Sequence, residues 1–120
     1  FVTVQESVAI GFIAALVSNW AIARQSKSGL DDTLDVFPSH GVGGMVGMVL
    51  TGVFAADVGL TSGETDTFLW HLVALVGVAI FTFGASLLLF KLVDKAIPLR
   101  VTGWQETLGL DESQHGETVD

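Results

Sequence analysis

Three long apolar runs, each almost free of charge, constrain this chain more than any other feature. They cover about residues 7–24, 36–57 and 67–93. A helix needs about 20 mostly apolar residues to cross the hydrocarbon core of a bilayer. Half of the 120 residues are hydrophobic and 15% are charged, a balance that indicates a membrane protein. The runs predict an all-α integral membrane protein with three transmembrane helices, although the first run could also be a buried helix of a soluble protein.

The composition argues against several other classes of protein. The formal net charge is −8, whereas nucleic acid is bound mainly through Lys and Arg. The chain has no cysteine, so neither a disulfide framework nor a thiolate metal site is expected. It starts at Phe1 without a signal-peptide pattern. We therefore expect it to be the C-terminal part of a longer protein.

The basic residues predict the orientation of the three spans. They lie in two places, after the first run and after the third: Arg24, Lys27, Lys91, Lys95 and Arg100. The positive-inside rule places both groups on the cytoplasmic side. Residues 1–6 and 61–66 would then lie outside, and the acidic tail, residues 101–120, would be cytoplasmic. Trp70, near the outer end of the third span, fits an interfacial aromatic residue.

The second run carries a histidine among small residues. Ionisable groups at membrane depth usually face a protein interior, a cavity or a substrate path, which makes His40 a candidate functional residue. Gly43 and Gly47 form a GxxxG pair of the kind that lets helix backbones approach closely. At α-helical spacing His40 shares a face with Gly44, Gly47 and Thr51. This pattern fits either a pore-facing imidazole or plain helix packing with an interhelical hydrogen bond, and the spacing does not decide between them.

Acidic residues lead into this run. Asp31, Asp32 and Asp35 precede Pro38, which belongs in the first turn of a helix. A helix that starts two residues before Pro38 places His40 about 6 Å along its axis. Either His40 is therefore shallow in the membrane, or the aspartates also lie below its surface, shielded by protein.

Two motifs resemble the ammonium transporter (Amt/Mep/Rh) family. The segment Asp-Asp-Thr-Leu-Asp-Val-Phe-Pro-Ser-His-Gly-Val-Gly-Gly, from residue 31, is similar to the tenth-helix pattern Asp-Asp-x-x-Asp-Val-Phe-x-x-His-Gly-x-x-Gly. Leu99-Arg100-Val101 and the later Gly-Leu-Asp-Glu-Ser-Gln-His-Gly-Glu, residues 109–117, resemble the tail of the bacterial Amt branch. The resemblance implies an eleven-helix trimeric fold. This chain would supply its last three helices, within residues 1–100, and a cytosolic regulatory tail, residues 101–120.

The resemblance also implies roles for individual residues. His40 matches the second of two pore-lining histidines, whose partner would lie upstream, and Phe37 is placed with it in the substrate pore. Asp32 and Asp35 match acidic positions that support the cytoplasmic side of the pore, as structural or proton-path groups. Gly43, Gly44 and Gly47 are expected in helix packing. His71 occupies a position usually filled by Gln, so we expect it to form an interfacial hydrogen bond and not to line the pore.

The tail and two departures from the family pattern complete the prediction. The residues that match the regulatory motif are Gly109, Leu110, Asp111 and Gly116; a solvated end is the alternative, and His115 is not expected to be a ligand. Pro38 stands where many members have Gly. Thr102-Gly103-Trp104-Gln105 replaces the usual acidic run, which leaves the docking of the tail open.

The resemblance implies passage of ammonium or ammonia across the cell membrane through a hydrophobic pore. The expected partners are ammonium, the lipid bilayer, two further copies of the chain in a homotrimer, and a PII-type signal protein at the cytosolic face. A sensor or partner-recruiting protein on the same fold is the alternative. A haem-binding subunit using His40 and His71 is a third reading, which their opposite positions in the membrane argue against. We expect no enzymatic activity, no cofactor and no metal site.

Overall fold

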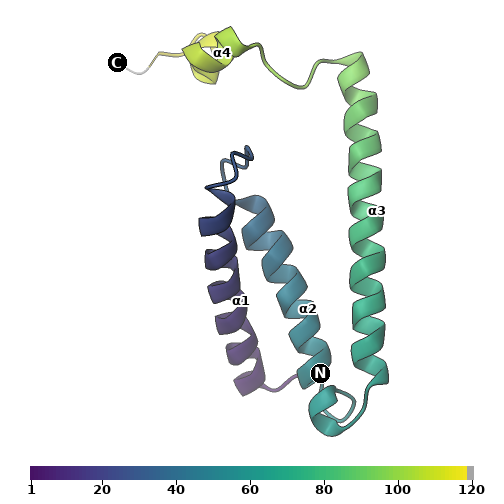
Figure 1. Ribbon diagram of the computed structural model, residues 1–120. Coiled ribbons are helices and arrows are strands. Elements are labelled where there is room, and N and C mark those ends of the chain that lie inside the picture. The colour runs from purple at the N-terminus through teal and green to yellow at the C-terminus, as the bar shows by residue number, and fades with distance from the viewer. Residues whose placement is uncertain (119–120) are drawn as a thin grey trace. The chain divides into compact units, whose positions relative to one another are not determined.

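The computed structural model describes residues 1–118, which fold into helices and turns without a strand. Contacts divide the chain into two units, Phe1–Ala79 and Ile80–Asp120 (Figure 1). Three helices are long and apolar enough to cross a membrane: Val4–Gln25, Phe37–Phe54 and Asp66–Ala96. The prediction of an all-α chain with three candidate spans is confirmed.

The first helix, α1, spans Val4–Gln25 and so begins three residues before its predicted start. A capping box explains the earlier start. The Thr3 backbone N–H donates to Glu6 Oε2 at 2.7 Å, and the Glu6 N–H donates to Thr3 Oγ1 at 3.3 Å. These two bonds satisfy donors that a helix N-terminus would otherwise leave unpaired. Glu6 therefore belongs to the helix and not to the segment before it.

The second span forms in two parts. A π-helical turn, Phe37–Val42, leads directly into α2, Gly43–Phe54. Pro38 lies in the first turn, as predicted, and is fully buried. The helix ends three residues before the predicted end because Ala55 leaves the helical conformation, with ψ of 122°, and Asp57 has a left-handed φ of 62°.

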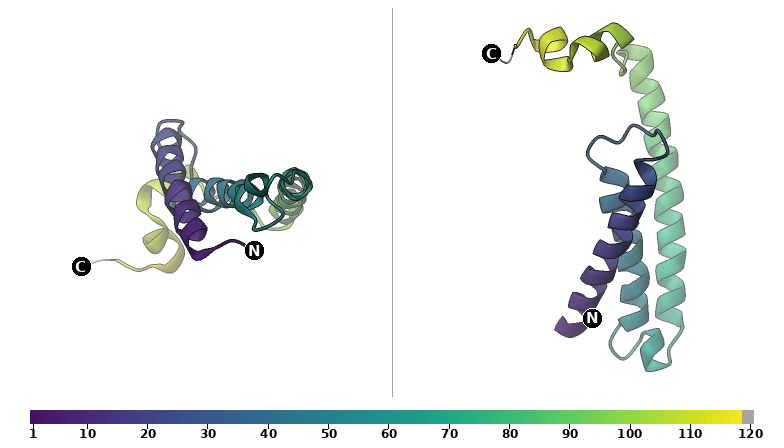
Figure 2. Two further views of the ribbon diagram at one scale, coloured as in Figure 1. Left: turned by 90° about the horizontal axis from the view of Figure 1, so that it is seen from below. Right: turned by 60° about the vertical axis from the view of Figure 1, so that its left-hand side comes forward.

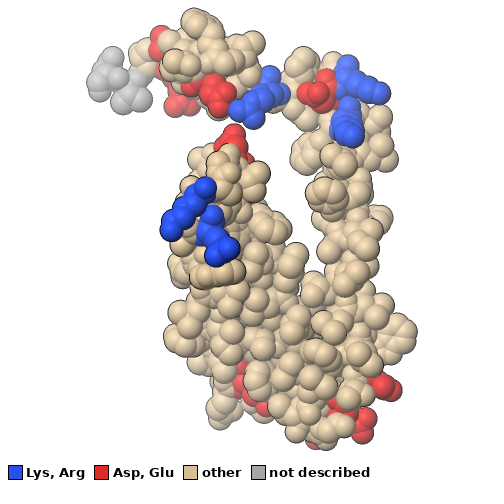
Figure 3. All heavy atoms as spheres, in the orientation of Figure 1, with Lys and Arg blue, Asp and Glu red and all other residues tan. Residues whose placement is uncertain are grey.

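Helices α1 and α2 lie side by side and run in opposite directions (Figures 1 and 2). Gly43 lies at this interface, since a Cβ on it would come within 2.9 Å of Ser18 Oγ. Arg24 lies in the last turn of α1 and Lys27 follows it, so the basic residues of this unit lie at the end of the pair where α1 finishes. The acidic side chains of the loop after α2 lie at the opposite end (Figure 3).

A short connection, including the 3-10 turn Leu60–Ser62, leads from α2 into the third helix, α3, Asp66–Ala96. Gly59 makes this connection possible. A Cβ there would lie 2.6 Å from the Ala55 backbone nitrogen and 2.7 Å from the Val53 carbonyl oxygen. Only glycine permits such an approach between backbone segments.

In the second unit, α3 continues to Ala96, three residues beyond the predicted end of the third span. Its end is explained by Pro98, because the residue before a proline disfavours helical conformation. The Leu99 N–H then donates to Asp94 Oδ1 at 2.9 Å. The tail forms α4, Gly103–Leu108, and a π turn, Asp111–His115.

Most large apolar side chains are exposed in this chain. Phe12 of α1 is 65% exposed and Phe81 of α3 is 74% exposed, whereas the small side chain of Ala55 is completely buried. Burial of apolar area contributes roughly 25 cal/mol per Å². Helices with this much uncovered apolar surface are therefore suited to lipid or to further protein packed against them.

Candidate functional site

The predicted pore residue His40 lies in the π-helical turn Phe37–Val42. We call residues 32–43 the His40 turn. The imidazole is exposed, and it makes no hydrogen bond or ion pair with any residue in the described range 1–118. Its backbone carbonyl is used, accepting the N–H of Gly43. π-helical turns are rare and occur frequently at functional sites. The His40 side chain belongs to such a turn and has no polar partner among the described residues.

The carboxylate of Asp32 organises the start of this turn. Its Oδ1 accepts the Val36 N–H at 2.9 Å, and its Oδ2 accepts the Phe37 N–H at 2.9 Å. Oδ2 also accepts the side-chain amide of Gln25, the last residue of α1, at 2.7 Å. The bond from the Phe37 N–H, followed by those from Gln25 and Val36, lowers the pKa of Asp32 below its ordinary value. Three donors thus stabilise the charged form of this side chain.

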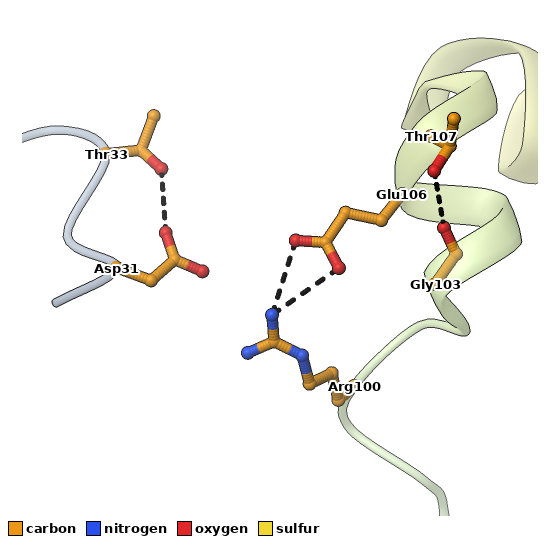
Figure 4. A network of polar contacts seen from close by, with 6 residues as sticks. All are labelled: Asp31, Thr33, Arg100, Gly103, Glu106 and Thr107. Atoms are coloured by element: carbon orange, nitrogen blue, oxygen red, sulfur yellow. Dashed lines mark hydrogen bonds and ion pairs between the residues drawn. The ribbon is translucent and has the colours of Figure 1, made fainter. Parts of the chain in front are cut away.

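Asp35 contributes through its backbone. Its φ of 51° is left-handed, a conformation that Asp adopts more readily than most residues. Its N–H donates to the Asp32 carbonyl at 3.0 Å, and its own carbonyl accepts the Ser39 hydroxyl at 2.6 Å and the Ser39 N–H at 3.0 Å. In the same loop the Thr33 hydroxyl donates to Asp31 Oδ1 at 3.3 Å (Figure 4). The aspartate segment is therefore a folded turn that sets the direction of the second span.

The ring of Phe37, the other predicted pore residue, lies over Gly41. A Cβ on Gly41 would be 3.0 Å from Phe37 Cδ2 and 3.2 Å from its Cε2. Phe37 is 57% exposed, so more than half of its surface is not covered by this chain. His40 and Phe37 are thus two exposed rings within one turn.

The three glycines predicted to pack differ in their surroundings. Gly43 contacts α1 at Ser18, whereas Gly44 and Gly47 would meet no atom within 4 Å if they carried a Cβ. Packing at Gly44 and Gly47 stays a prediction that concerns surfaces outside this chain. The face that His40 was expected to share with Gly44, Gly47 and Thr51 assumed α-helical spacing, which applies only from Gly43 onward because His40 lies in the π turn.

The second histidine of the apolar segments, His71, is held by its neighbours. Its Nδ1 lies 2.8 Å from the Thr67 carbonyl oxygen, and its ring stacks on that of Phe1 with 5.9 Å between centroids. Gly52 of α2 packs against it, since a Cβ there would be 3.3 Å from His71 Cβ and from Phe68 Cα. His71 forms a hydrogen bond within its own helix and takes part in packing between three segments.

The tail is more ordered than its composition predicts. Thr102 and Gln105, part of the segment that departs from the family pattern, form a capping box for α4, with the Thr102 N–H donating to Gln105 Oε1 at 2.9 Å. Arg100 pairs with Glu106 at 3.3 Å, and the Thr107 hydroxyl donates to the Gly103 carbonyl at 2.9 Å (Figure 4). Local capping therefore replaces apolar packing as the source of order.

The predicted regulatory residues follow α4. Gly109 and Gly116 have positive φ, 102° and 67°, which side-chain-bearing residues rarely adopt. Leu110 is 53% exposed, and Asp111 beside it is exposed as well. The two glycines thus shape the segment, and two of the side chains between them, those of Leu110 and Asp111, are exposed.

Sequence reasoning missed two residues, Gln25 and Gly52. Gln25 bonds Asp32 across seven residues, and Gly52 accommodates His71. A polar residue at the end of an apolar run and a glycine within one were the available signals, and neither identifies a partner. Among the described residues, no three His, Cys, Asp or Glu side chains gather in a way that could hold a metal ion.

Comparison with known proteins agrees with the motifs. A family model described as the Ammonium Transporter Family matches residues 1–120. The chain is 38% identical to an ammonium transporter of Bacillus subtilis, covering 98% of this chain and 31% of that protein. It is 35% identical to ammonium transporter Amt1 of Archaeoglobus fulgidus (99% and 32%) and 34% identical to ammonium transporter 2 of Schizosaccharomyces pombe (98% and 26%). The chain thus spans about a third or less of the length of these relatives, and no solved structure matches it.

Proposed function

Because this chain belongs to the ammonium transporter family, we propose that it forms part of a path for ammonium or ammonia across the cell membrane. Its three apolar helices and its family make it a multi-pass membrane protein. The family points to a transporter and not to an enzyme. The relatives in Bacillus subtilis and Archaeoglobus fulgidus are named ammonium transporters, which supports the same cargo here.

The state of His40 is the observation that supports a pore role best. Within the His40 turn, the Val36 and Phe37 N–H groups donate to the Asp32 carboxylate. The exposed imidazole of His40 has no polar partner among the described residues. An ionisable side chain at the start of an uncharged span needs a functional or structural reason to be there. An aqueous or substrate-filled path beside His40 and Phe37 supplies that reason.

The chemistry of imidazole suits this cargo. Bare ammonium is as costly at membrane depth as any other buried charge. Imidazole titrates near neutral pH and both donates and accepts hydrogen bonds, so it can take the proton of ammonium and return one. We propose that His40 acts with a second histidine in this way, and that Phe37 narrows the path beside it. Asp32 then acts structurally, since its oxygens are occupied by three donors.

We also propose the orientation, the assembly and the role of the tail, from the placement of the basic residues and from the family. The two basic groups lie on the cytoplasmic side, together with the acidic tail. The protein assembles as a homotrimer, and residues 109–116 contact a PII-type protein. Deleting residues 101–120 should leave an assembled trimer with altered transport and no PII co-purification. Unchanged uptake and unchanged co-purification would count against the tail proposal.

His40→Ala in the full-length protein, reconstituted in proteoliposomes, tests the proposed function. We expect altered ammonium current or altered selectivity against similar cations, with normal trimer yield. His40→Glu should keep part of the current, because a carboxyl group can also relay a proton. Normal, equally selective current from His40→Ala would remove His40 from the mechanism. Absence of ammonium current from the unmodified protein, with ammonium binding retained, would favour a sensor.

A further inference from the structure

One hydrogen bond connects the end of α1 to the His40 turn. Gln25 Nε2 donates to Asp32 Oδ2 at 2.7 Å, and that oxygen also accepts the Phe37 N–H at 2.9 Å. The second carboxylate oxygen accepts the Val36 N–H. The position of the Asp32 carboxylate therefore fixes the first amide groups of the π turn, and Gln25 helps to fix the carboxylate.

Other polar side chains at the end of α1 have different partners. The Ser26 hydroxyl donates to the Ile22 carbonyl and the Ser28 hydroxyl to the Gln25 carbonyl, both at the end of α1 itself. The Arg24 guanidinium lies 5.4 Å from the centre of the Trp20 ring. Gln25 and Asp32 are both half-buried, in contrast to most of the loop between them. The hydrogen bond from Gln25 to Asp32 thus joins the two ends of the loop formed by residues 26–31.

The chemistry of an amide matters at this position. A neutral donor satisfies one lone pair of Asp32 and leaves the full carboxylate charge to attract the two backbone N–H groups. A carboxylate at position 25 would repel Asp32, and an apolar side chain would leave Oδ2 with one donor fewer. Charge-assisted hydrogen bonds of this kind are about twice as strong as neutral ones.

We propose that Gln25 is a positioning residue for transport, which acts through Asp32 to set the place of His40 relative to α1. This inference rests on the proposed role of His40. Gln25 lies outside the π turn, and its side-chain amide is engaged by Asp32, so the hydrogen bond to Asp32 is its link to that turn. Misplacing a functional group by about 1 Å can cost a large factor in rate.

Gln25→Leu in the full-length protein is the first test, with Gln5→Leu as the matched control. Both residues are glutamines of α1, and Gln5 is exposed in the first turn of the helix. Ammonium current per incorporated trimer should fall about tenfold in Gln25→Leu, the factor that corresponds to losing one hydrogen bond to a charged group, and should not change in Gln5→Leu. Full current in a correctly folded Gln25→Leu variant would overturn the proposal.

A double-mutant cycle with His40→Ala separates positioning from general stability. If Gln25 acts through His40, adding Gln25→Leu to His40→Ala should reduce the current no further, because coupled sites are non-additive. An equal additional loss in that background would overturn the proposal. If His40→Ala reduces current while Gln25→Leu does not, only the role of Gln25 fails. If His40→Ala changes neither the current nor its selectivity, the proposed role of His40 fails and the role of Gln25 fails with it.

A charge-neutral exchange supplies a second, independent variant. Gln25→Glu alone should lower current at least as much as Gln25→Leu, because two carboxylates then face each other. Adding Asp32→Asn lets the new amide donate to the new carboxylate, with the hydrogen bond reversed and the net charge unchanged. We expect at least roughly threefold recovery of current over Gln25→Glu, short of full recovery because the asparagine side chain keeps one acceptor oxygen for two backbone N–H groups. No recovery in a folded Gln25→Glu/Asp32→Asn protein would overturn the proposal.

Discussion

The two histidines of the apolar segments, His40 and His71, have opposite surroundings. His71 has a hydrogen-bonding partner in the Thr67 carbonyl, a stacking partner in Phe1 and a close neighbour in Gly52. The His40 ring is exposed and has no polar partner in residues 1–118. In the His40 turn the Val36 and Phe37 N–H groups donate to Asp32 while the His40 ring has no polar partner, whereas the His71 ring is part of the packing. A histidine thus contributes to packing at position 71, whereas at position 40 its ring is exposed.

The backbone of the two regions has a feature in common. The second span is bracketed by two aspartates with left-handed φ, Asp35 at 51° and Asp57 at 62°. This conformation is unfavourable for most L-residues and is tolerated best by Gly, Asn and Asp. After Asp57 the chain closes tightly around Gly59, while after Asp35 it enters the π turn. The connection after α2 is thus built for packing, and the His40 turn for presenting side chains.

The largest expected effect on the packed region comes from Gly59→Ala. The new Cβ would lie 2.6 Å from the Ala55 nitrogen and 2.7 Å from the Val53 carbonyl oxygen, so the backbone must shift. We expect a loss of about 3 kcal/mol in stability, measured as a lower thermal midpoint in detergent. Gly77→Ala is the control, because no atom lies within 4 Å of its Cβ position. Equal midpoints for the two variants would contradict the close approach at Gly59.

A smaller effect is expected where α2 meets His71. Gly52→Val should cost about 2 kcal/mol, because overpacking displaces neighbours, here His71 and Phe68, which already lie 3.3 Å from the Cβ position. Gly47→Val should change stability by less than about 0.5 kcal/mol if only this chain surrounds it. Thermal unfolding of both variants checks the difference. A large loss for Gly47→Val would instead place another helix against Gly47, as its GxxxG spacing predicts.

The smallest expected effect concerns the acid sensitivity of the His40 turn. Hydrogen bonds lower the pKa of Asp32 in the folded state. Its contribution to stability is therefore fully present above the ordinary aspartate pKa and is lost as the pH falls through the lower folded value. The thermal midpoint of Asp32→Asn should decline less than that of the parent between about pH 5 and about pH 3. Gln25→Leu should lie between them, and parallel curves for Asp32→Asn and the parent would contradict the role of these bonds.

The sequence predicted the existence of the three spans because each is a long run of apolar residues, a signal that survives small local changes. It predicted their ends less well. The start of α1 depends on the capping box between Thr3 and Glu6, and the end of α2 depends on Asp57 and Gly59. Such termini are set by individual side chains and backbone angles, which a hydropathy pattern does not contain.

Within the candidate site, residue type and motif identified His40, Asp32 and Phe37. The π turn was not predicted, because a run of apolar and small residues has the same composition in α- and π-helical form. Gln25 was missed because its partner is seven residues away across a loop, and nothing in the order of residues pairs them. The position of a side chain is thus predicted where its own type constrains it and missed where a distant partner does.

We propose that His40 serves transport, whereas His71 packs within the fold. The most direct test measures ammonium current in proteoliposomes and the thermal midpoint in detergent on the same preparations of His40→Ala and His71→Ala. We predict that His40→Ala changes the current or its selectivity at an unchanged midpoint. His71→Ala should cost about 1 to 3 kcal/mol of stability and so lower the midpoint, while the protein that remains folded transports normally. Normal, equally selective current in His40→Ala, or altered current per folded protein in His71→Ala, would contradict this division of roles.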